Sequence, residues 1–297
     1  MSGTDRTIGF IGLGIMGKPA SKNLVDAGYD LIVNDVRDEP VAELESHGAK
    51  SRPTPKAVAA DSDVVITFLP EEKHVREVAL GDDGIIEGTE PGQVYIDMST
   101  VGPNAIREVA DALEAEGVET VDAPVSGSEE GARDAWMSIM VGGSEGTVEA
   151  HWDLFDVMGG SVVHVGETGA GQVAKICNNM IVAAEVTSLA EALVFAEKAG
   201  IEQENLIEAI RGGAAQTWAL DTRAENMIDG EFDPGFFASY MYKDLRIATR
   251  DGEEYGAPQF ITSTNHELYK SLEEQGRGDL DFSGVMTLYE QLAGTDE

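Results

Sequence analysis

Near the start of the chain lies the glycine-rich segment Gly9-Phe10-Ile11-Gly12-Leu13-Gly14-Ile15-Met16-Gly17, the strongest indication of the fold. Its last three glycines have the spacing G-x-G-x-x-G. Such glycines permit a tight turn, close approach of the backbone to a pyrophosphate, and close packing of a helix on a strand. The flanking patterns predict a strand over Thr7–Ile11 and a helix over Ile15–Ala27. We therefore predict a dinucleotide-binding turn, with helix amides facing the phosphates. It comprises Gly12, Leu13, Gly14, Ile15, Met16 and Gly17.

Short apolar runs alternate with amphipathic segments throughout the first half of the chain, which is typical of parallel strands joined by helices. Further strands are predicted at Asp30–Asn34, Val64–Phe68, Val94–Asp97, Glu119–Asp122, Met137–Val141 and Val162–Val165. Further helices are predicted at Val41–His47, Lys73–Leu80, Asn104–Glu116 and Thr147–Asp156. Continuous apolar runs such as Val64-Val65-Ile66 suit a sheet that is covered on both faces. The first half therefore predicts an α/β, doubly wound sheet of the Rossmann type.

The pattern changes after Val165. The segment Gln172–Lys198 contains no Gly or Pro and predicts one helix of roughly 40 Å, long enough to join two domains. Further helices are predicted at Gln203–Arg211, Met241–Tyr255, Pro258–Gln275 and Ser283–Leu292. We expect a dinucleotide-binding domain over residues 1–167 and an all-helical domain over residues 168–297, joined by the long helix.

Asp35 ends the second predicted strand, 18 residues beyond Gly17. A carboxylate at this place can accept the ribose hydroxyls and repel a 2′-phosphate, which favours NAD over NADP. The alternative is a solvated aspartate at a strand end, since acidic residues abound here. Arg37 could instead serve a 2′-phosphate, so NADP stays open. We assign Asn34, Asp35 and Val36 to the cofactor.

The chain is strongly acidic, with 55 Asp and Glu against 20 Lys and Arg and a formal net charge of −35. Nucleic-acid binding needs a basic surface, so this balance argues against it. The acids are scattered through the chain, and their mutual repulsion destabilises a compact state unless salt screens it. We interpret the excess as halophilic adaptation, with an ordinary acidic enzyme as the alternative.

Sequence features also suggest where the protein works. The single cysteine, Cys177, cannot form an intramolecular disulfide, which fits a reducing compartment. The N-terminus leads almost directly into a strand pattern without a signal sequence, and no apolar run reaches ~18 residues. We expect a cytoplasmic protein without a membrane partner. The five histidines lack ligand spacing, so no metal site is expected.

Several later motifs extend the pattern. They are Leu69-Pro70, Asp97-Met98-Ser99-Thr100, Asp122-Ala123-Pro124-Val125-Ser126-Gly127, Gly169-Ala170-Gly171 before Lys175 and Asn179, and Lys243-Asp244-Leu245. In this order and spacing the chain resembles the β-hydroxyacid dehydrogenases, which include 3-hydroxyisobutyrate dehydrogenase and tartronate semialdehyde reductase. The resemblance covers nearly the whole chain. It implies a Rossmann-type domain, an interdomain helix, a helical C-terminal domain and a homodimer or homotetramer.

Lys175 is the candidate catalytic residue. Its neighbours in the long helix are apolar, and desolvation lowers the pKa of an ammonium toward the range that suits a general acid or base. In the family that the chain resembles, the matching lysine donates a proton to the substrate oxygen during carbonyl reduction and accepts it during oxidation. Asn179 lies one turn later and matches a residue that hydrogen-bonds the substrate and orients the lysine. The alternative for an isolated lysine is a surface position.

The resemblance also implies substrate and cofactor contacts. Ser126 and Gly127 match the turn that holds the substrate carboxylate, but Ser128 stands where the family usually has a second glycine. This departure, followed by two glutamates, leaves the substrate open. The substrate set is completed by Trp218, Phe236 and Asp244, with core packing as the alternative for the two aromatic residues. The cofactor set is completed by Leu69, Pro70, Thr100 and Lys243.

We therefore expect an oxidoreductase that transfers a hydride between NAD, or NADP, and a small 3-hydroxy acid or its semialdehyde. One alternative is a reductase of an imine, phosphorylated or sulfonated substrate on the same fold. Imine reductases usually lack the lysine, and 6-phosphogluconate dehydrogenases carry His-Asn where this chain has Asn178-Asn179. The other alternative is a non-catalytic cofactor-binding module.

Overall fold

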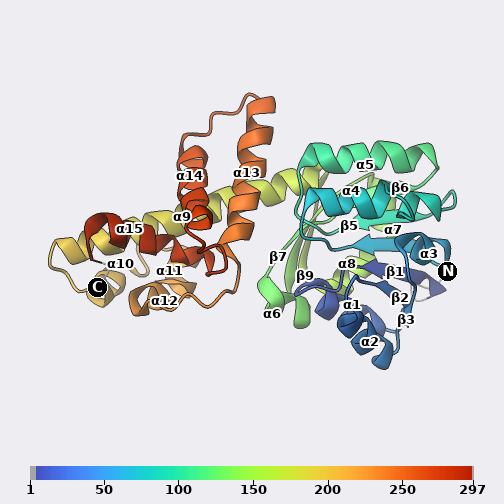
Figure 1. The fold of residues 1–297 in the computed structure, drawn as a ribbon, viewed down its shortest axis with the longest axis horizontal. Coiled ribbons are helices and arrows are strands. Elements are labelled where there is room, and N and C mark those ends of the chain that lie inside the picture. Colours follow the sequence, from blue (N-terminus) through green and yellow to red (C-terminus); the bar gives the residue numbers. More distant parts are fainter. Residues whose placement is uncertain (1–4, 296–297) are drawn as a thin grey trace. The chain divides into compact units, whose positions relative to one another are not determined.

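The computed structural model of the 297-residue chain describes residues 5–295. The chain divides into two compact units, Met1–Lys175 and Ile176–Glu297. The first is an α/β unit built on one sheet, and the second is helical (Figure 1). The predicted fold class is confirmed. The division falls inside the long helix α9 (Ala170–Lys198), whereas the predicted boundary lies just before that helix.

The sheet of the first unit has the order β3-β2-β1-β4-β5-β6-β8-β7, with β9 paired to β8. Its strands are β1 (Thr7–Ile11), β2 (Asp30–Asn34), β3 (Lys50–Ser51), β4 (Val64–Thr67), β5 (Val94–Asp97), β6 (Glu119–Asp122), β7 (Val125–Ser126), β8 (Met137–Gly142) and β9 (Gly159–Gly166). The pairs from β3 to β6 are parallel, and β8 runs antiparallel to β6 and β7. From β1 the chain first adds β2 and β3 on one side, and it then crosses back to add β4, β5 and β6 on the other side. Doubly wound dinucleotide-binding sheets show this reversal of direction next to their first strand.

Helices cover both faces of this sheet. They are α1 (Gly17–Asp26), α2 (Asp38–Ser46), α3 (Pro55–Ala60), α4 (Glu72–Leu80), the 3-10 helix η2 (Ile85–Glu87), α5 (Pro103–Ala115), α6 (Ser128–Arg133), α7 (Glu145–Ala150) and α8 (Trp152–Met158). Successive strand residues point to opposite faces, so Val64 and Ile66 pack with residues of α1, α2, α7 and α8. Val65 packs on the other face with residues of α3, α4 and α5. The continuous apolar strands therefore reflect burial on both faces.

The second unit has its own core. Beyond α9 its helices are α10 (Gln203–Ile210), α11 (Trp218–Thr222), α12 (Ala224–Asp229), α13 (Ala238–Glu254), α14 (Phe260–Glu274), the 3-10 helix η3 (Phe282–Val285) and α15 (Met286–Ala293). Ala183, Val186 and Leu193 of α9 pack there with residues of α13 and α14. The Tyr269 hydroxyl donates a hydrogen bond to the Phe282 carbonyl, which ties α14 to η3.

Helix α9 is long and apolar enough, by length and composition alone, to cross a membrane, with a mean hydropathy of 1.5 over its most apolar window. Half of that window is buried inside the protein. The sequence contains no uninterrupted apolar run of this length. The mean hydropathy is nevertheless high, because it averages over the few charged residues within the helix. Its buried apolar residues from Ala183 to Val194 belong to the core of the second unit.

Some predicted elements differ from the structure. The predicted helix Thr147–Asp156 is two helices, α7 and α8, which meet at His151. The predicted helix Ser283–Leu292 begins as the 3-10 helix η3 and continues as α15. Short elements went unpredicted, because two to six residues give too little periodicity. They are β3, α3, β7, α6, α11 and α12.

Candidate active site

The glycine turn lies at the carboxyl end of β1. At Gly12 φ is +97°, and a Cβ there would lie 2.4 Å from the Phe68 carbonyl oxygen. A Cβ at Gly17 would lie 2.0 Å from the Gly12 carbonyl oxygen. A Cβ at Gly14, by contrast, would meet no described residue within 4 Å. The protein itself therefore requires the first and third glycines, whereas the second faces open space, as close approach of a pyrophosphate needs.

Asp35 lies directly beside this turn. Its carboxylate accepts hydrogen bonds from the Leu13 amide at 2.7 Å and from the Arg37 amide and Nε, each at 2.9 Å. Burial raises the pKa of Asp35, but these hydrogen bonds outweigh it and hold the pKa below its ordinary value. The Asp35 side chain is 6% exposed and that of Arg37 58% exposed. Asp35 is thus ionised, and the exposed arginine covers it.

Of the other residues predicted to bind the cofactor, Val36, Leu69, Pro70 and Thr100 lie on loops at the same end of the sheet, whereas Lys243 lies on α13 of the second unit. Ser99 Oγ, after β5, accepts a hydrogen bond from the Leu69 amide, after β4, at 2.8 Å. Val36 is almost fully exposed, and Ile15 is about half exposed. The Asn34 side chain instead donates to the Arg52 carbonyl at 2.8 Å, so its amide holds the loop after β3.

Two buried aspartates end neighbouring strands. Asp97 accepts hydrogen bonds from the hydroxyls of Thr67 and Ser99. Asp122 accepts from the amides of Gly169 and Gln172, at 2.6 and 2.7 Å. The pKa of Asp122 is raised to about 7, because burial and the nearby Asp97 raise it by more than the two amides lower it. Asp122 therefore fixes the first turn of α9. Both aspartates belong to sequence motifs, but the sequence alone indicated no role for them.

Lys175 lies on the buried face of α9. The residue is 7% exposed, and Gln172 and Asn179, at helical spacing on either side, are 0% and 5% exposed. Residues three and four apart share one face of a helix. Of its apolar neighbours in sequence, Ile176 is buried and Cys177 is exposed. No sequence motif indicated Gln172.

Within the second unit, Asn179 is held by Asp244 and Asn178. Asn179 Nδ2 donates to Asp244 Oδ2 at 2.5 Å, and Asn178 Nδ2 donates to Asn179 Oδ1 at 2.9 Å. Lys243 Nζ lies 3.3 Å from Asp244 Oδ1, with both side chains largely buried. The structure thus brings together three residues predicted to act in the site, Asn179, Lys243 and Asp244.

Trp218 and Phe236 belong to an aromatic cluster of the second unit. Trp218 stacks on Phe282 at 6.3 Å between ring centroids, and Phe236 packs edge-on against Phe282 at 5.8 Å. Phe236 also packs against Tyr240, whose ring lies 6.0 Å from Lys243 Nζ. Trp218 is half exposed, so it offers an open aromatic face as well as a packed one.

An ion pair that sequence reasoning missed supports this cluster. Arg223 Cζ lies 4.9 Å from the Trp218 ring centroid, and its Nε donates to Asp281 at 3.2 Å. Asp281 also accepts the amides of Gly235 and Phe236. The pair therefore positions the segment that carries Phe236.

The turn assigned to the substrate carboxylate follows β7. Ser126 ends this strand, and Gly127 has φ +149°. Ser128 has φ +58°, a left-handed conformation that costs a residue with a Cβ roughly 1–2 kcal/mol. This explains physically why glycine suits the position. The turn retains the left-handed backbone although the residue is serine.

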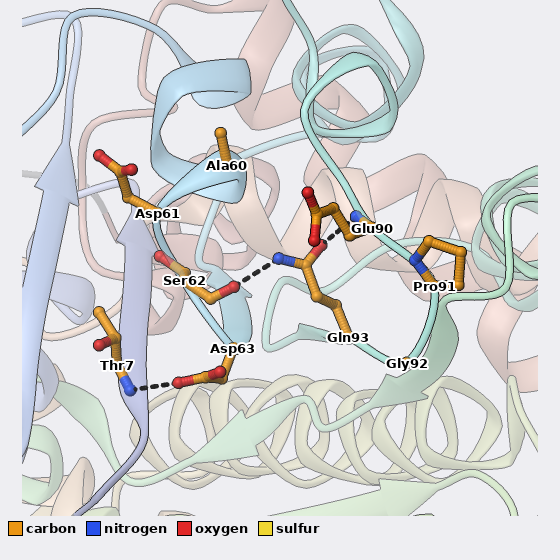
Figure 2. A pocket seen from close by; sticks show the side chains of 9 residues that line it. All are labelled: Thr7, Ala60, Asp61, Ser62, Asp63, Glu90, Pro91, Gly92 and Gln93. Atoms are coloured by element: carbon orange, nitrogen blue, oxygen red, sulfur yellow. Dashed lines mark hydrogen bonds between the residues drawn. The ribbon is translucent and has the colours of Figure 1, made fainter.

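A separate pocket lies at the amino ends of the strands, opposite the end that carries the cofactor turn (Figure 2). It is bounded by Thr7, at the start of β1, by Asp61–Asp63 before β4, and by Glu90–Gln93 before β5. Doubly wound sheets bind their ligands beyond the carboxyl ends of the strands, whereas these are amino ends. Its polar groups also hold the loops together, since Asp63 accepts a hydrogen bond from the Thr7 amide.

Among residues 5–295, no group of His, Cys, Asp and Glu could hold a metal ion.

Comparisons with known proteins cover both units. Residues 7–166 match the NAD binding domain of 6-phosphogluconate dehydrogenase. Residues 169–289 match a domain described as NAD-binding of NADP-dependent 3-hydroxyisobutyrate dehydrogenase. The chain is 36% identical to 2-(hydroxymethyl)glutarate dehydrogenase of Eubacterium barkeri, over 97% of this chain and 96% of that protein. It is 37% identical to 2-hydroxy-3-oxopropionate reductase of Escherichia coli (strain K12), over 96% and 98% of the two chains.

A solved structure agrees with these matches. The 3-hydroxyisobutyrate dehydrogenase of Mycobacterium tuberculosis, solved with L-serine, is 35% identical, with a TM-score of 0.90 over 96% of this chain and 99% of that chain. The family predicted from the motifs is confirmed. The chain belongs to the β-hydroxyacid dehydrogenases, oxidoreductases that bind NAD or NADP.

Proposed function

We propose that this enzyme transfers a hydride reversibly between NAD and a small 3-hydroxy acid or its semialdehyde, with Lys175 as the general acid and base. The proposal rests mainly on the position of Lys175, which is 7% exposed and lies on the same buried face of α9 as Asn179. The names of the relatives support the substrate class, because each acts on a small acid with a hydroxymethyl or aldehyde group.

The residues divide the chemistry among them. Bound NAD would supply the acceptor for the hydride that leaves the carbon carrying the hydroxyl group. Lys175, in its neutral form, accepts the hydroxyl proton during oxidation and returns it to the carbonyl oxygen during reduction. Asn179, held by Asp244, hydrogen-bonds the reacting oxygen. Ser126 and Gly127 hold the substrate carboxylate, Ser128 belongs to the same turn, and Asp244 supports the network through Asn179.

Further residues bind the cofactor and the remainder of the substrate. The Gly12–Gly17 turn would hold the pyrophosphate, since Gly14 leaves room for it. By the family resemblance, Lys243 would bind the nicotinamide end of the cofactor, and Leu69, Pro70 and Thr100 would bind it from the loops after β4 and β5. Trp218 and Phe236 pack against the substituent of the acid. These roles follow the family resemblance.

A panel of acids tests the proposal. We expect NAD reduction at 340 nm with one or more of 3-hydroxyisobutyrate, D-glycerate, L-serine, 3-hydroxypropionate and 2-(hydroxymethyl)glutarate, assayed in high salt. NADP is run in parallel. Turnover with a panel member supports the reaction class and identifies the substituent that the pocket accepts. Cofactor binding without any turnover across the panel would contradict the proposal.

Asp35 gives the enzyme its preference for NAD. Replacing it with asparagine removes the negative charge beside the ribose and releases Arg37, which Asp35 now holds. Hydrogen bonds to charged groups contribute about 1.5–3 kcal/mol. We therefore expect Asp35→Asn to lower the ratio of kcat/KM for NAD to that for NADP by at least ~10-fold, since 1.4 kcal/mol is tenfold.

Steady-state kinetics with both cofactors measure this ratio. Asp153→Asn is the matched control, because Asp153 also pairs with an arginine, Arg6, which precedes the amino end of β1. The assignment is wrong if Asp35→Asn leaves the ratio unchanged, or if the native enzyme already prefers NADP.

We also propose that the enzyme is a halophilic, cytoplasmic homodimer or homotetramer. The net charge of −35 supports adaptation to salt, and a single cysteine suits a reducing compartment. Ile181 and Phe195 of α9 are 61% and 75% exposed, and apolar side chains exposed along one helix favour contact with another subunit.

A further inference from the structure

Gln172 holds the main chain on both sides of Thr100. Its side-chain Nε2 donates to the Ser99 carbonyl oxygen at 2.8 Å, and its Oε1 accepts from the Val101 amide at 3.0 Å. The residue is fully buried. A carboxamide is suited to this because it offers a donor and an acceptor side by side. The first turn of α9 is thereby attached to the loop after β5.

The loop that Gln172 holds belongs to a larger network. Ser99 Oγ accepts from the Leu69 amide and donates to Asp97 Oδ1 at 2.6 Å. Leu69 and Thr100 are both assigned to the cofactor in the proposed function. A short chain of direct hydrogen bonds therefore leads from Gln172 to both cofactor loops.

A second anchor holds the start of the same helix. Asp122 accepts the main-chain amides of Gly169 and Gln172, one with each carboxylate oxygen. These bonds hold the end of the helix in place through its backbone. The Gln172 side chain adds a contact to one side of the helix, which resists rotation about the helix axis.

Rotation of α9 matters because Lys175 lies on the face that Gln172 holds. Lys175 comes three residues after Gln172, less than one helical turn, so both side chains share the buried face of the helix. A lysine side chain is long, and a small rotation of the helix moves its amine by a large distance. Displacement of a catalytic group by about 1 Å can cost ~100-fold in rate.

We infer that Gln172 is a positioning residue, which sets the rotation of α9 against the Ser99–Val101 loop and thereby places the Lys175 amine relative to the cofactor. The inference rests on the proposed function, because it supposes that Lys175 is the acid and base. It predicts that both hydrogen bonds of the carboxamide are needed. Methionine has nearly the same length and offers neither bond, whereas glutamate keeps an acceptor for Val101 but turns an oxygen toward the Ser99 carbonyl.

The chain offers a matched control in Gln93 (Figure 2). Its carboxamide also joins main-chain segments, because Nε2 donates to the Ala59 and Ser62 carbonyls and Oε1 accepts the Glu90 amide. It does so at the amino edge of the sheet, remote in the fold from the cofactor loops. Gln93→Met therefore removes a comparable set of hydrogen bonds to the main chain without changing the predicted site.

The test compares Gln172→Met, Gln172→Glu and Gln93→Met with the native enzyme, at a temperature where thermal unfolding shows each to be folded. We expect Gln172→Met to lower kcat about 10- to 100-fold and to change the affinity for NAD by less than about threefold. The isotope effect with substrate deuterated at the reacting carbon should rise, because chemistry becomes the slow step. Gln172→Glu should also lose activity, and Gln93→Met should keep the native kcat and isotope effect.

A second measurement does not depend on turnover. Reductive methylation with formaldehyde and borohydride, followed by peptide mass spectrometry, gives the rate at which Lys175 reacts. We expect Gln172→Met to change this rate and Gln93→Met to leave it unchanged. The inference is overturned if the two methionine variants match in kcat, isotope effect and labelling. A native enzyme that binds NAD but shows no turnover would contradict the proposed function instead, and the labelling rates would then decide the role of Gln172 alone.

Discussion

Replacing Lys175 with alanine is expected to lower kcat at least ~100-fold while the enzyme still binds NAD, because general acid–base groups contribute ~100- to 10,000-fold. Lys175 lies on the buried face of α9, whereas the cofactor turn is formed by Gly12–Gly17 and Asp35. Removing the amine leaves that turn intact. Steady-state turnover at 340 nm gives kcat, and calorimetric titration gives the affinity for NAD.

Two further variants make the result specific to the amine. Lys198→Ala, at the exposed end of the same helix, is the control for loss of a positive charge and should keep the native kcat. Lys175→Arg should be as inactive as the alanine variant, because a guanidinium stays protonated and cannot accept the hydroxyl proton. Partial recovery of Lys175→Ala by added methylamine would identify proton transfer as the lost step. Near-native turnover of Lys175→Ala would refute the assignment.

Dilute buffer is expected to destabilise the protein strongly. The charge of −35 is carried by acids spread along the chain, and the distance over which they repel falls from ~30 Å in 0.01 M salt to ~3 Å in 1 M salt. We expect the Tm to rise by at least ~10 °C between these conditions, which for a chain of this size corresponds to a few kcal/mol. Activity should rise in parallel. Thermal unfolding followed by circular dichroism measures the effect.

The ionic origin of this effect can be separated from general stabilisation by solutes. Sodium and potassium chloride should both raise the Tm, whereas sorbitol at the same osmolality should raise it much less. Full activity and an unchanged Tm in dilute buffer would show that the acidic surface is an ordinary one and not an adaptation to salt.

The central strands were predictable because of how they are buried. Strands β1, β2, β5 and β6 begin and end where the sequence predicts, since each is a short run of mostly buried residues, and a polar Asn34, Asp97 or Asp122 is the last residue of three of them. The break between α7 and α8 was not predictable from periodicity. At the break the His151 ring hydrogen-bonds the Thr147 carbonyl at 2.8 Å, and such a local side-chain bond leaves no trace in the pattern of apolar residues.

Some residues of the candidate site could likewise be predicted from the sequence, and others could not. The glycine turn and Asp35 could be predicted because the pyrophosphate and the ribose impose a fixed spacing along one strand–turn–helix unit. Lys175 and Asn179 followed from a family resemblance. Asp122 and Gln172 could not be predicted, because their partners lie about 50 and 70 residues away in sequence. Nothing in a local pattern indicates that a buried carboxamide will meet a particular loop.

The three glycines of the cofactor turn are needed for different reasons. Gly12 and Gly17 are constrained by the chain itself, since a Cβ at either would collide with backbone atoms. Gly14 meets no described neighbour, so folding alone gives no reason to retain it. A descendant that lost its cofactor but kept its shape would preserve positions 12 and 17 while position 14 drifted. The middle glycine therefore records whether a member of this lineage still uses a dinucleotide, and the outer two record whether it still folds.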